Sequence, residues 1–151
     1  MIRYLLFAGA LALSAACTPA QEAKEETPVA SNAVPAPTPD DVTVRITAAQ
    51  NGQTVNVAVN QRFAIELIGV PTAGYLWAPA QLPAFITRAG EATGNTVVEQ
   101  SDPGYAGGNH WEVTMFSATG PGTGEIVMEQ RRPWETTEPA SQTFRVTIVA
   151  Q

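Results

Sequence analysis

The sequence predicts an all-β domain, an immunoglobulin-like antiparallel β-sandwich of about seven or eight short strands. The first observation is strict alternation of apolar and polar residues over several runs, which is typical of strands with one buried face. The second is that short stretches rich in glycine, proline, asparagine and serine separate these runs. The third is that no segment shows a sustained helical period, which argues against long amphipathic helices. A small β-barrel is the alternative.

The alternation defines six segments, and each has an inward-facing set of apolar side chains. In chain order these sets are Val42, Val44 and Ile46; Val55, Val57 and Val59; Phe63, Ile65 and Leu67; Trp111, Val113 and Met115; Ile126 and Met128; and Phe144, Val146 and Ile148. Their neighbours, among them Ala64, Glu66, His110 and Glu112, are predicted on the outer faces. Residues 80–92 have the least clear pattern, and we expect a short irregular strand there.

The first 17 residues predict an export signal, because Arg3 is followed by an apolar run and then by small residues. The uncharged run is shorter than the roughly 20 residues that a membrane-spanning helix needs. The ending L-S-A-A-C resembles the lipobox of bacterial lipoproteins, in which the cysteine, here Cys17, is lipidated and becomes the mature N-terminus. Ser14 stands where an aliphatic residue is more usual, and simple cleavage before Cys17 or after Ala20 is the alternative.

Lipidation of Cys17 places the protein in the cell envelope, anchored to a membrane and facing the periplasm or the cell surface. Thr18 in place of aspartate favours the outer membrane by analogy. Simple cleavage predicts a periplasmic or secreted protein instead. Because Cys17 is the only cysteine, the folded part has no disulfide and depends on its hydrophobic core.

Residues 18–41 are rich in proline, alanine, threonine and glutamate and contain no aromatic residue, which predicts a disordered linker. The chain therefore divides into a signal peptide (1–17), this linker and a sandwich domain (42–151). The formal net charge is −6, and basic residues are nowhere concentrated. We expect no nucleic-acid partner and no membrane contact other than a lipid anchor.

The inventory of reactive residues argues against an enzyme. His110 is the only histidine, and no G-x-S-x-G elbow accompanies it. One histidine and one cysteine do not assemble a usual zinc site, and no phosphate loop or dinucleotide fingerprint is present. The carboxylates Glu112, Glu125 and Glu129 fall on predicted outer faces, where charge is solvated. We expect no catalysis, no cofactor and no metal.

Three loops combine glycine or proline with an aromatic residue. Two predicted strands separate the loops at 101–109 and 131–141, so both are expected at the same end of the sandwich. The strand count leaves the position of the loop at 69–74 open. Trp134 stands in a polar loop, where it either anchors an interface or folds back onto its own core.

These three loops, in this order on an all-β chain, resemble those of the chagasin family of cysteine-protease inhibitors. That family carries the motifs N-P-T-T-G-Y-x-W, G-x-G-G and R-P-W. Here residues 70–77 read V-P-T-A-G-Y-L-W, residues 105–108 read Y-A-G-G, and residues 132–134 read R-P-W. The resemblance implies a reversible, tight-binding inhibitor, and we expect a monomer. Its three loops occlude the active-site cleft of papain-like cysteine proteases.

The resemblance also implies which residues touch the protease. They are Pro71, Thr72, Ala73 and Gly74; Tyr105, Ala106, Gly107 and Gly108; and Arg132, Pro133 and Trp134. Thr72 is expected near the catalytic cysteine, the loop 105–108 along the substrate-side subsites, and Trp134 against aromatic surface on the leaving-group side.

Three positions depart from the family pattern: Val70 replaces asparagine, Ala73 replaces threonine, and Tyr105 replaces glycine. Asparagine can close a turn through its side chain, whereas Val70 restricts the backbone to extended conformations. These departures motivate the alternative function. It is a non-inhibitory binding or structural lipoprotein of the cell envelope that keeps an immunoglobulin-like domain.

Overall fold

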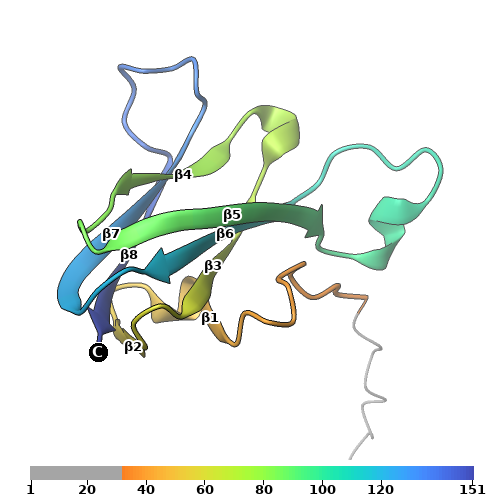
Figure 1. The fold of residues 1–151 in the computed structure, drawn as a ribbon. Helices are drawn as coiled ribbons and strands as arrows, with labels where there is room; N and C mark the ends of the chain where they lie inside the picture. The colour runs from red at the N-terminus through yellow and green to blue at the C-terminus, as the bar shows by residue number, and fades with distance from the viewer. Residues whose placement is uncertain (1–31) are drawn as a thin grey trace, which may run out of the picture. The chain divides into compact units, whose positions relative to one another are not determined.

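The structure, a computed structural model, describes residues 32–151. The predicted signal peptide, Cys17 and the first part of the predicted linker lie outside the described residues. Within the described part, eight strands form two four-stranded sheets, and the only helices are short 3-10 turns (Figure 1). The predicted β-sandwich of seven or eight strands is confirmed. None of the helices in this part is long and apolar enough to cross a membrane.

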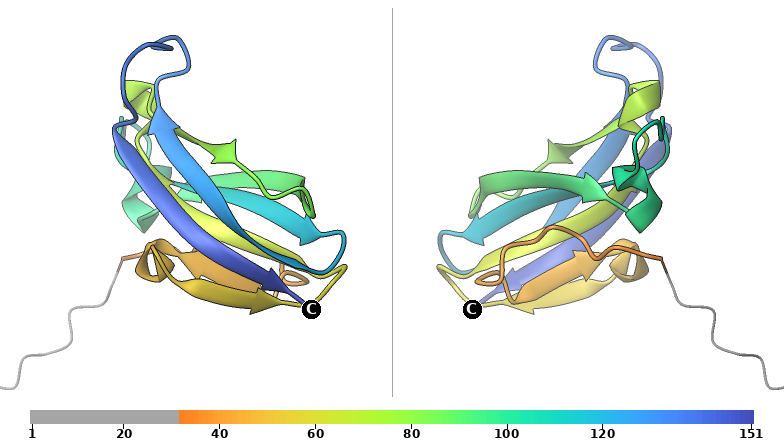
Figure 2. Two further views of the ribbon diagram at one scale, coloured as in Figure 1. Left: turned by 90° about the vertical axis from the view of Figure 1, so that its left-hand side faces the viewer. Right: turned by 90° about the vertical axis from the view of Figure 1, so that its right-hand side faces the viewer.

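The first sheet has the order β1-β3-β6-β5 and the second β2-β8-β7-β4. The strands of the first are β1 (Val44–Thr47), β3 (Arg62–Gly69), β6 (His110–Ala118) and β5 (Ile86–Asn95). Those of the second are β2 (Thr54–Val57), β8 (Gln142–Ala150), β7 (Gly122–Arg131) and β4 (Leu76–Gln81). Figure 2 shows the two layers from the sides.

Two pairings depart from the antiparallel pattern, because β1 runs parallel to β3 and β2 runs parallel to β8. The 3-10 turn η1 (Ala48–Gln50) carries the chain from the edge of one sheet to the edge of the other. Gln50 fixes this turn, since its side-chain oxygen accepts the backbone N–H of Thr47 at 2.8 Å. Because η1 joins β1 to β2, consecutive parts of the chain form an edge strand of the first sheet and an edge strand of the second.

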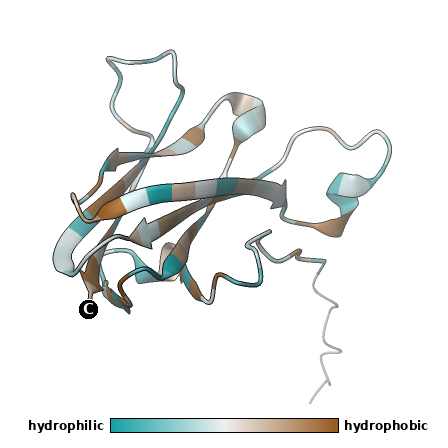
Figure 3. Ribbon diagram, viewed as in Figure 1, coloured by the Kyte–Doolittle hydropathy of each residue, from teal (hydrophilic) through white to brown (hydrophobic). Residues whose placement is uncertain are grey.

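The main core lies between the sheets, and the apolar residues recur along the strands in Figure 3. Phe63 and Phe116 stack at its centre with ring centroids 5.6 Å apart. The inward sets predicted for β3 and β8 are buried in this core, as are Ile126 and Met128 of β7. Burial of these side chains is the main force that holds the disulfide-free domain together.

The predicted facing of β6 is wrong. Phe116 and Ala118 belong to the core between the sheets, whereas Val113 and Met115 lie in a second cluster with Val42 and Ala64. The outer face of this strand is apolar because that side of the sheet is also covered, whereas the inner face includes polar His110, Glu112 and Thr114, so alternation indicated the wrong face. His110 and Glu112 pair with Gly69 and Leu67 and therefore lie on the side of the main core, contrary to expectation.

The second sheet covers the inner face of the first sheet, and residues 32–42 cover its outer face (Figure 1). These residues are here called the N-terminal strap. Composition assigned residues 32–41 to the linker. In the structure Val42 is fully buried, and the hydroxyl of Thr38 donates to the buried Glu66 carboxylate at 2.5 Å. Arg45 also lies 3.8 Å from that carboxylate. Glu66 and Ala64 are therefore buried rather than solvated, because the strap covers them.

Residues 80–92, the least clear part of the sequence, form the end of β4 and the first part of β5. Strand β5 is ten residues long, and its pairing with β6 shifts between Arg88 and Gly90. Gly90 has a φ of +142°, which side chains with a Cβ rarely adopt. The bulge interrupts the two-residue period and accounts for the weak pattern.

Candidate functional site

All three motif loops leave the same end of the sandwich (Figures 1 and 2). His110, the first residue of β6, pairs with Gly69 on one side and Asn95 on the other. In the second sheet Arg131, the last residue of β7, pairs with Leu76, the first of β4. The shared end predicted from strand parity for the second and third loops is thus confirmed. The loop at 70–75, whose position the sequence left open, joins them there.

The loop at 70–75 is a 3-10 turn, η2 (Pro71–Ala73), closed by its own backbone. The carbonyl of Val70 accepts the N–H of Ala73 at 3.0 Å and that of Tyr75 at 3.3 Å. Gly74 ends the turn in the left-handed region, with a φ of +82°. The backbone therefore supplies the closure that an asparagine at position 70 could have provided, and Thr72 is exposed at the apex.

Trp77 and Glu112 fix the base of this loop. The indole Nε1 of buried Trp77 donates to the carbonyl of Ile68 at 3.0 Å, and its backbone N–H donates to Glu112 Oε2 at 2.8 Å. Burial raises the pKa of the Glu112 carboxyl, while the Trp77 N–H and His110 oppose the rise. Glu112 was predicted on a solvated face, so sequence reasoning missed its role.

Glu112 reaches this position because Gly69 leaves room for it. A Cβ on Gly69 would overlap the Glu112 carboxylate, whose Oε1 has no hydrogen-bond partner among the described residues. An adjacent cavity of about 310 Å³ is lined by Pro71, Leu76, Trp77, His110 and Glu112, together with part of β5. The other two carboxylates considered in the sequence are ion-paired, Glu125 with Arg145 and Glu129 with Arg131.

Arg132 joins the third loop to the first. Its Nε donates to the carbonyl of Ala73 at 2.9 Å, and its guanidinium lies 4.5 Å from the centroid of the Tyr75 ring. A further nitrogen, Nη1, pairs with Glu135 at 3.0 Å within its own loop. The planar guanidinium thus makes three different contacts at once, which an ammonium group could not reproduce.

Trp134 packs against the first loop rather than against its own core. A Cβ on Gly74 would lie 2.3 Å from a carbon of the indole ring, so the ring occupies the space that glycine leaves. Trp134 is nevertheless 67% exposed, the highest value among the exposed large hydrophobic residues of the described part. The reading in which Trp134 folds back onto its own core is wrong.

The second loop has a separate scaffold. The side chain of Gln100 accepts the backbone N–H groups of Thr96 and Val97 at 2.6 and 3.1 Å and donates to the carbonyl of Asn109 at 2.8 Å. These bonds close the base of residues 96–109. The tip is glycine-rich, and Gly104, Gly107 and Gly108 have φ values of +92°, +84° and +94°.

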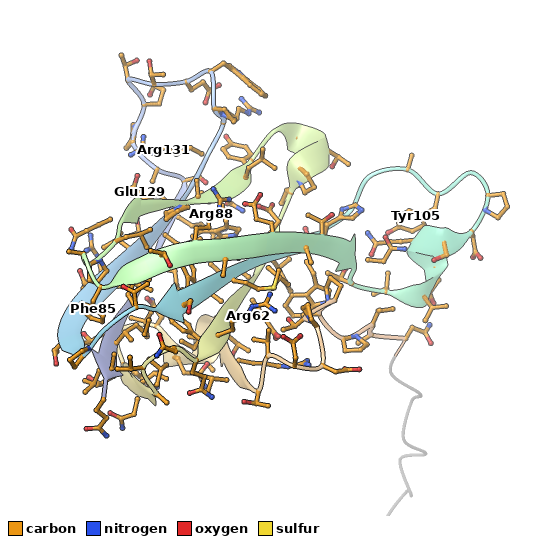
Figure 4. All side chains as sticks on the ribbon, viewed as in Figure 1. Arg62, Phe85, Arg88, Tyr105, Glu129 and Arg131 are labelled. Atoms are coloured by element: carbon orange, nitrogen blue, oxygen red, sulfur yellow. The ribbon has the colours of Figure 1, made fainter. Side chains whose placement is uncertain are left out.

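Tyr105 is half exposed on this loop and lies well apart from Arg131, which begins the third loop (Figure 4). No hydrogen bond or ion pair within residues 32–151 joins the second loop to the other two. The structure thus brings the predicted residues together in two groups. The first and third motifs form one contiguous surface, here called the wedge (residues 71–75 and 132–135), and the glycine-rich motif stands beside it.

Residues 32–151 contain no cluster of three or more side chains that could hold a metal ion. What the end of the domain offers is exposed backbone, an exposed tryptophan and an exposed threonine on fixed loops. Such a surface is suited to docking into a cleft.

Comparison with known proteins agrees with the resemblance of the three loops to those of peptidase inhibitors. The family model described as "Chagasin family peptidase inhibitor I42" matches residues 56–148. Amoebiasin-1 of Entamoeba histolytica is 32% identical over 93 residues, which cover 59% of this chain and 82% of that protein. Membership of a peptidase-inhibitor family confirms the expectation that the chain is not an enzyme.

Two solved structures share the fold. The cysteine protease inhibitor EhICP2 from Entamoeba histolytica superposes with a TM-score of 0.61 at 18% identity, covering 72% of this chain and 95% of that one. The solution structure of amebosin superposes with a TM-score of 0.56 at 26% identity, covering 72% and 97%. On the family match, the curated relative and the shared sandwich, the chain belongs to the chagasin family of peptidase inhibitors.

Proposed function

We propose that this protein inhibits papain-like cysteine proteases by inserting the wedge and the glycine-rich loop reversibly into the active-site cleft. The observation that carries the proposal is the hydrogen bond from Arg132 to the carbonyl of Ala73, because it makes two loops distant in sequence into one rigid surface. Fixed loops lose little conformational entropy on docking, so more of the contact energy appears as affinity.

The apex of the wedge explains how it can occupy a protease cleft without being a good substrate. Residues 71–73 are wound into a 3-10 turn, and Pro71 has no backbone N–H to donate. The turn is closed by hydrogen bonds to the carbonyls of Val70 and Pro71. A peptide held in this shape does not present an extended backbone in register with a catalytic cysteine, so Thr72 blocks the centre of the cleft.

Trp134 supplies the principal anchor in this arrangement. A tryptophan that is 67% exposed in the free protein gains the full benefit of burial only when a partner covers it. Its ring is already held against Gly74, so docking does not have to order it. The glycine-rich loop then lies along the substrate side, where glycines permit close backbone approach and Tyr105 adds a contact.

We further propose that Cys17 carries a lipid and tethers the inhibitor to the cell envelope. From Cys17 to Asn32 the chain advances 15 residues, which reach about 50 Å when extended at roughly 3.3 Å each. Incorporation of a radiolabelled fatty-acid precursor into the full chain, but not into the Cys17→Ser variant, tests this. Equal labelling of both would contradict it.

The function itself is tested by titrating a papain-like protease with residues 18–151. We expect stoichiometric inhibition that is reversed by dilution, with no cleavage of the inhibitor at residues 71–74. Absence of inhibition at concentrations on the order of tens of micromolar would exclude a specific complex and leave the alternative of a non-inhibitory envelope protein.

A further inference from the structure

The N-terminal strap reaches the end of the sandwich that carries the three motif loops, and it pairs there with the backbone at the start of the second loop. Its first residues pair with the start of the second loop: Val34 N–H donates to the carbonyl of Thr96 at 2.8 Å, and Val98 N–H donates to the carbonyl of Asn32 at 2.9 Å. Ala33 and Val97 form an antiparallel bridge between these bonds. The strap therefore adds a short strand to the backbone from which the 105–108 loop departs.

The opposite side of the strap is fixed to β6 and β5. Trp111 Nε1 donates to the carbonyl of Val34 at 2.7 Å, so both backbone polar groups of Val34 are engaged. Pro37 lies against Gly94, where an added Cβ would be 3.0 Å from the proline ring. Gly94 pairs with Trp111 in the sheet. The strap is thus held by the rigid sheet and in turn holds the loop.

A series of turn hydrogen bonds leads from the strap to the glycine-rich tip. The Asn32 side chain donates to Glu99, which belongs to the 3-10 turn η3 (Val98–Ser101). The carbonyl of Glu99 accepts the N–H of Asp102 at 3.0 Å, and the carbonyl of Asp102 accepts the N–H of Tyr105 at 3.2 Å. Each turn fixes the next, so displacement of η3 displaces Tyr105.

We propose that the strap is a positioning element that sets the 105–108 loop for the protease, with Val34 and Trp111 as its positioning residues. It stands outside residues 56–148, the part of the chain that the family model matches. The proposal rests on the proposed inhibitory function and adds a structural requirement to it. An inhibitor cut at residue 42, the boundary that composition suggests, lacks the element.

Two substitutions at Val34 test the hydrogen bond that attaches the strap to the second loop. In residues 18–151, Val34→Pro removes the N–H that bonds to Thr96, whereas Val34→Ala keeps it. The position already precedes Pro35 and is therefore biased toward extended backbone. Trp111→Phe is a second way to loosen the strap, because it removes the indole N–H that donates to the carbonyl of Val34 and keeps an aromatic ring. Ile46→Val, a buried change in β1, controls for lost stability.

We expect Val34→Pro and Trp111→Phe to dissociate from the protease about two to ten times faster, the range that one lost hydrogen bond corresponds to. Val34→Ala and Ile46→Val should stay within about twofold of the unmodified chain. Amide hydrogen exchange should accelerate at Val98, Asp102 and Tyr105 in the first two variants, and the exchange rates of Ala73 and Gly74 should not change.

The outcomes separate the two proposals. Unchanged dissociation despite faster exchange in the second loop overturns the positioning role and leaves inhibition standing. Failure of both Val34→Pro and Trp111→Phe to fold also overturns it, because the strap is then part of the fold's stability alone. Absence of inhibition by the unmodified chain removes the inhibitory function and the strap's role with it.

Discussion

Arg132 and Ala73 lie 59 residues apart in the sequence, yet Arg132 Nε donates to the Ala73 carbonyl at 2.9 Å. The same guanidinium covers the Tyr75 ring, and Trp134 two residues on fills the space above Gly74. The loops that carry the first and third motifs therefore form one surface before any partner arrives.

Arg132→Lys should weaken inhibition although it keeps the positive charge. A lysine cannot donate to Ala73, stack on Tyr75 and pair with Glu135 together, so loss of about 1 to 2 kcal/mol of binding free energy is expected. The inhibition constant should rise about five- to thirtyfold. Arg145→Lys, in the exposed pair with Glu125, is the control and should not change it.

Trp134→Ala should weaken inhibition by at least about 2 kcal/mol, roughly thirtyfold in the inhibition constant, because it removes the exposed aromatic anchor. The thermal midpoint should stay nearly unchanged, since most of this side chain lies in solvent. Inhibition kinetics and calorimetry of the same preparation measure both quantities. Undiminished inhibition would show that Trp134 lies outside the interface.

Gly74→Ala should displace the Trp134 indole, because the new methyl group has no room beneath the ring. It also places alanine at a φ of +82°, which costs about 1 kcal/mol. Gly52→Ala is the matched control, since its φ is +75° and nothing lies within 4 Å of the added Cβ. Both should lose similar stability, but only Gly74→Ala should weaken inhibition and alter tryptophan fluorescence.

Glu112 gives the stability of the domain a pH dependence of known sign. Its pKa is raised in the folded protein, so the folded state binds the proton more tightly than the unfolded chain does. The associated stabilisation is present below the ordinary carboxyl pKa of 4.5 and is lost as the pH rises through the folded value. Glu112→Gln cannot titrate and should lack this component.

Urea unfolding of both proteins between about pH 4 and pH 7.5 measures the difference. The free energy of unfolding of the unmodified protein, relative to that of Glu112→Gln, should decline as the pH rises across this range. A relative increase with pH would mean that the carboxylate is stabilised in its charged form by the Trp77 N–H, against the direction given by burial.

The sequence was sufficient for the fold and for the location of the second and third motif loops, but it left the position of the first loop open. Strands such as β3 and β8 carry clear alternation, and counting strands correctly placed the second and third loops at one end. Pro71 and Gly74 predicted a turn from their residue types alone. In the structure Pro71 begins a 3-10 turn and Gly74 ends it in the left-handed region.

The sequence was not sufficient where a segment is covered from an unexpected side. Residues 32–41 have the composition of a linker, and only the three-dimensional positions of Trp111, Thr96 and Glu66 show what holds them. Because residues 32–41 cover the outer face of the first sheet, β6 carries apolar side chains on that face, and the alternation therefore indicated the wrong inner face and a solvated Glu112. The link between Arg132 and Ala73 was equally hidden, because no periodicity relates a side chain to a distant carbonyl.

Inhibition by this mechanism requires that these loops occupy the cleft and cover the catalytic cysteine of the protease. The most direct measurement is the rate at which iodoacetamide alkylates that cysteine, with and without saturating residues 18–151. Occlusion predicts that alkylation slows in proportion to the fraction of protease bound. At an inhibitor concentration just above the inhibition constant of the unmodified chain, Trp134→Ala should therefore slow alkylation much less than the unmodified chain does. Full inhibition of substrate cleavage with an unchanged alkylation rate would place the inhibitor elsewhere on the enzyme and contradict the account.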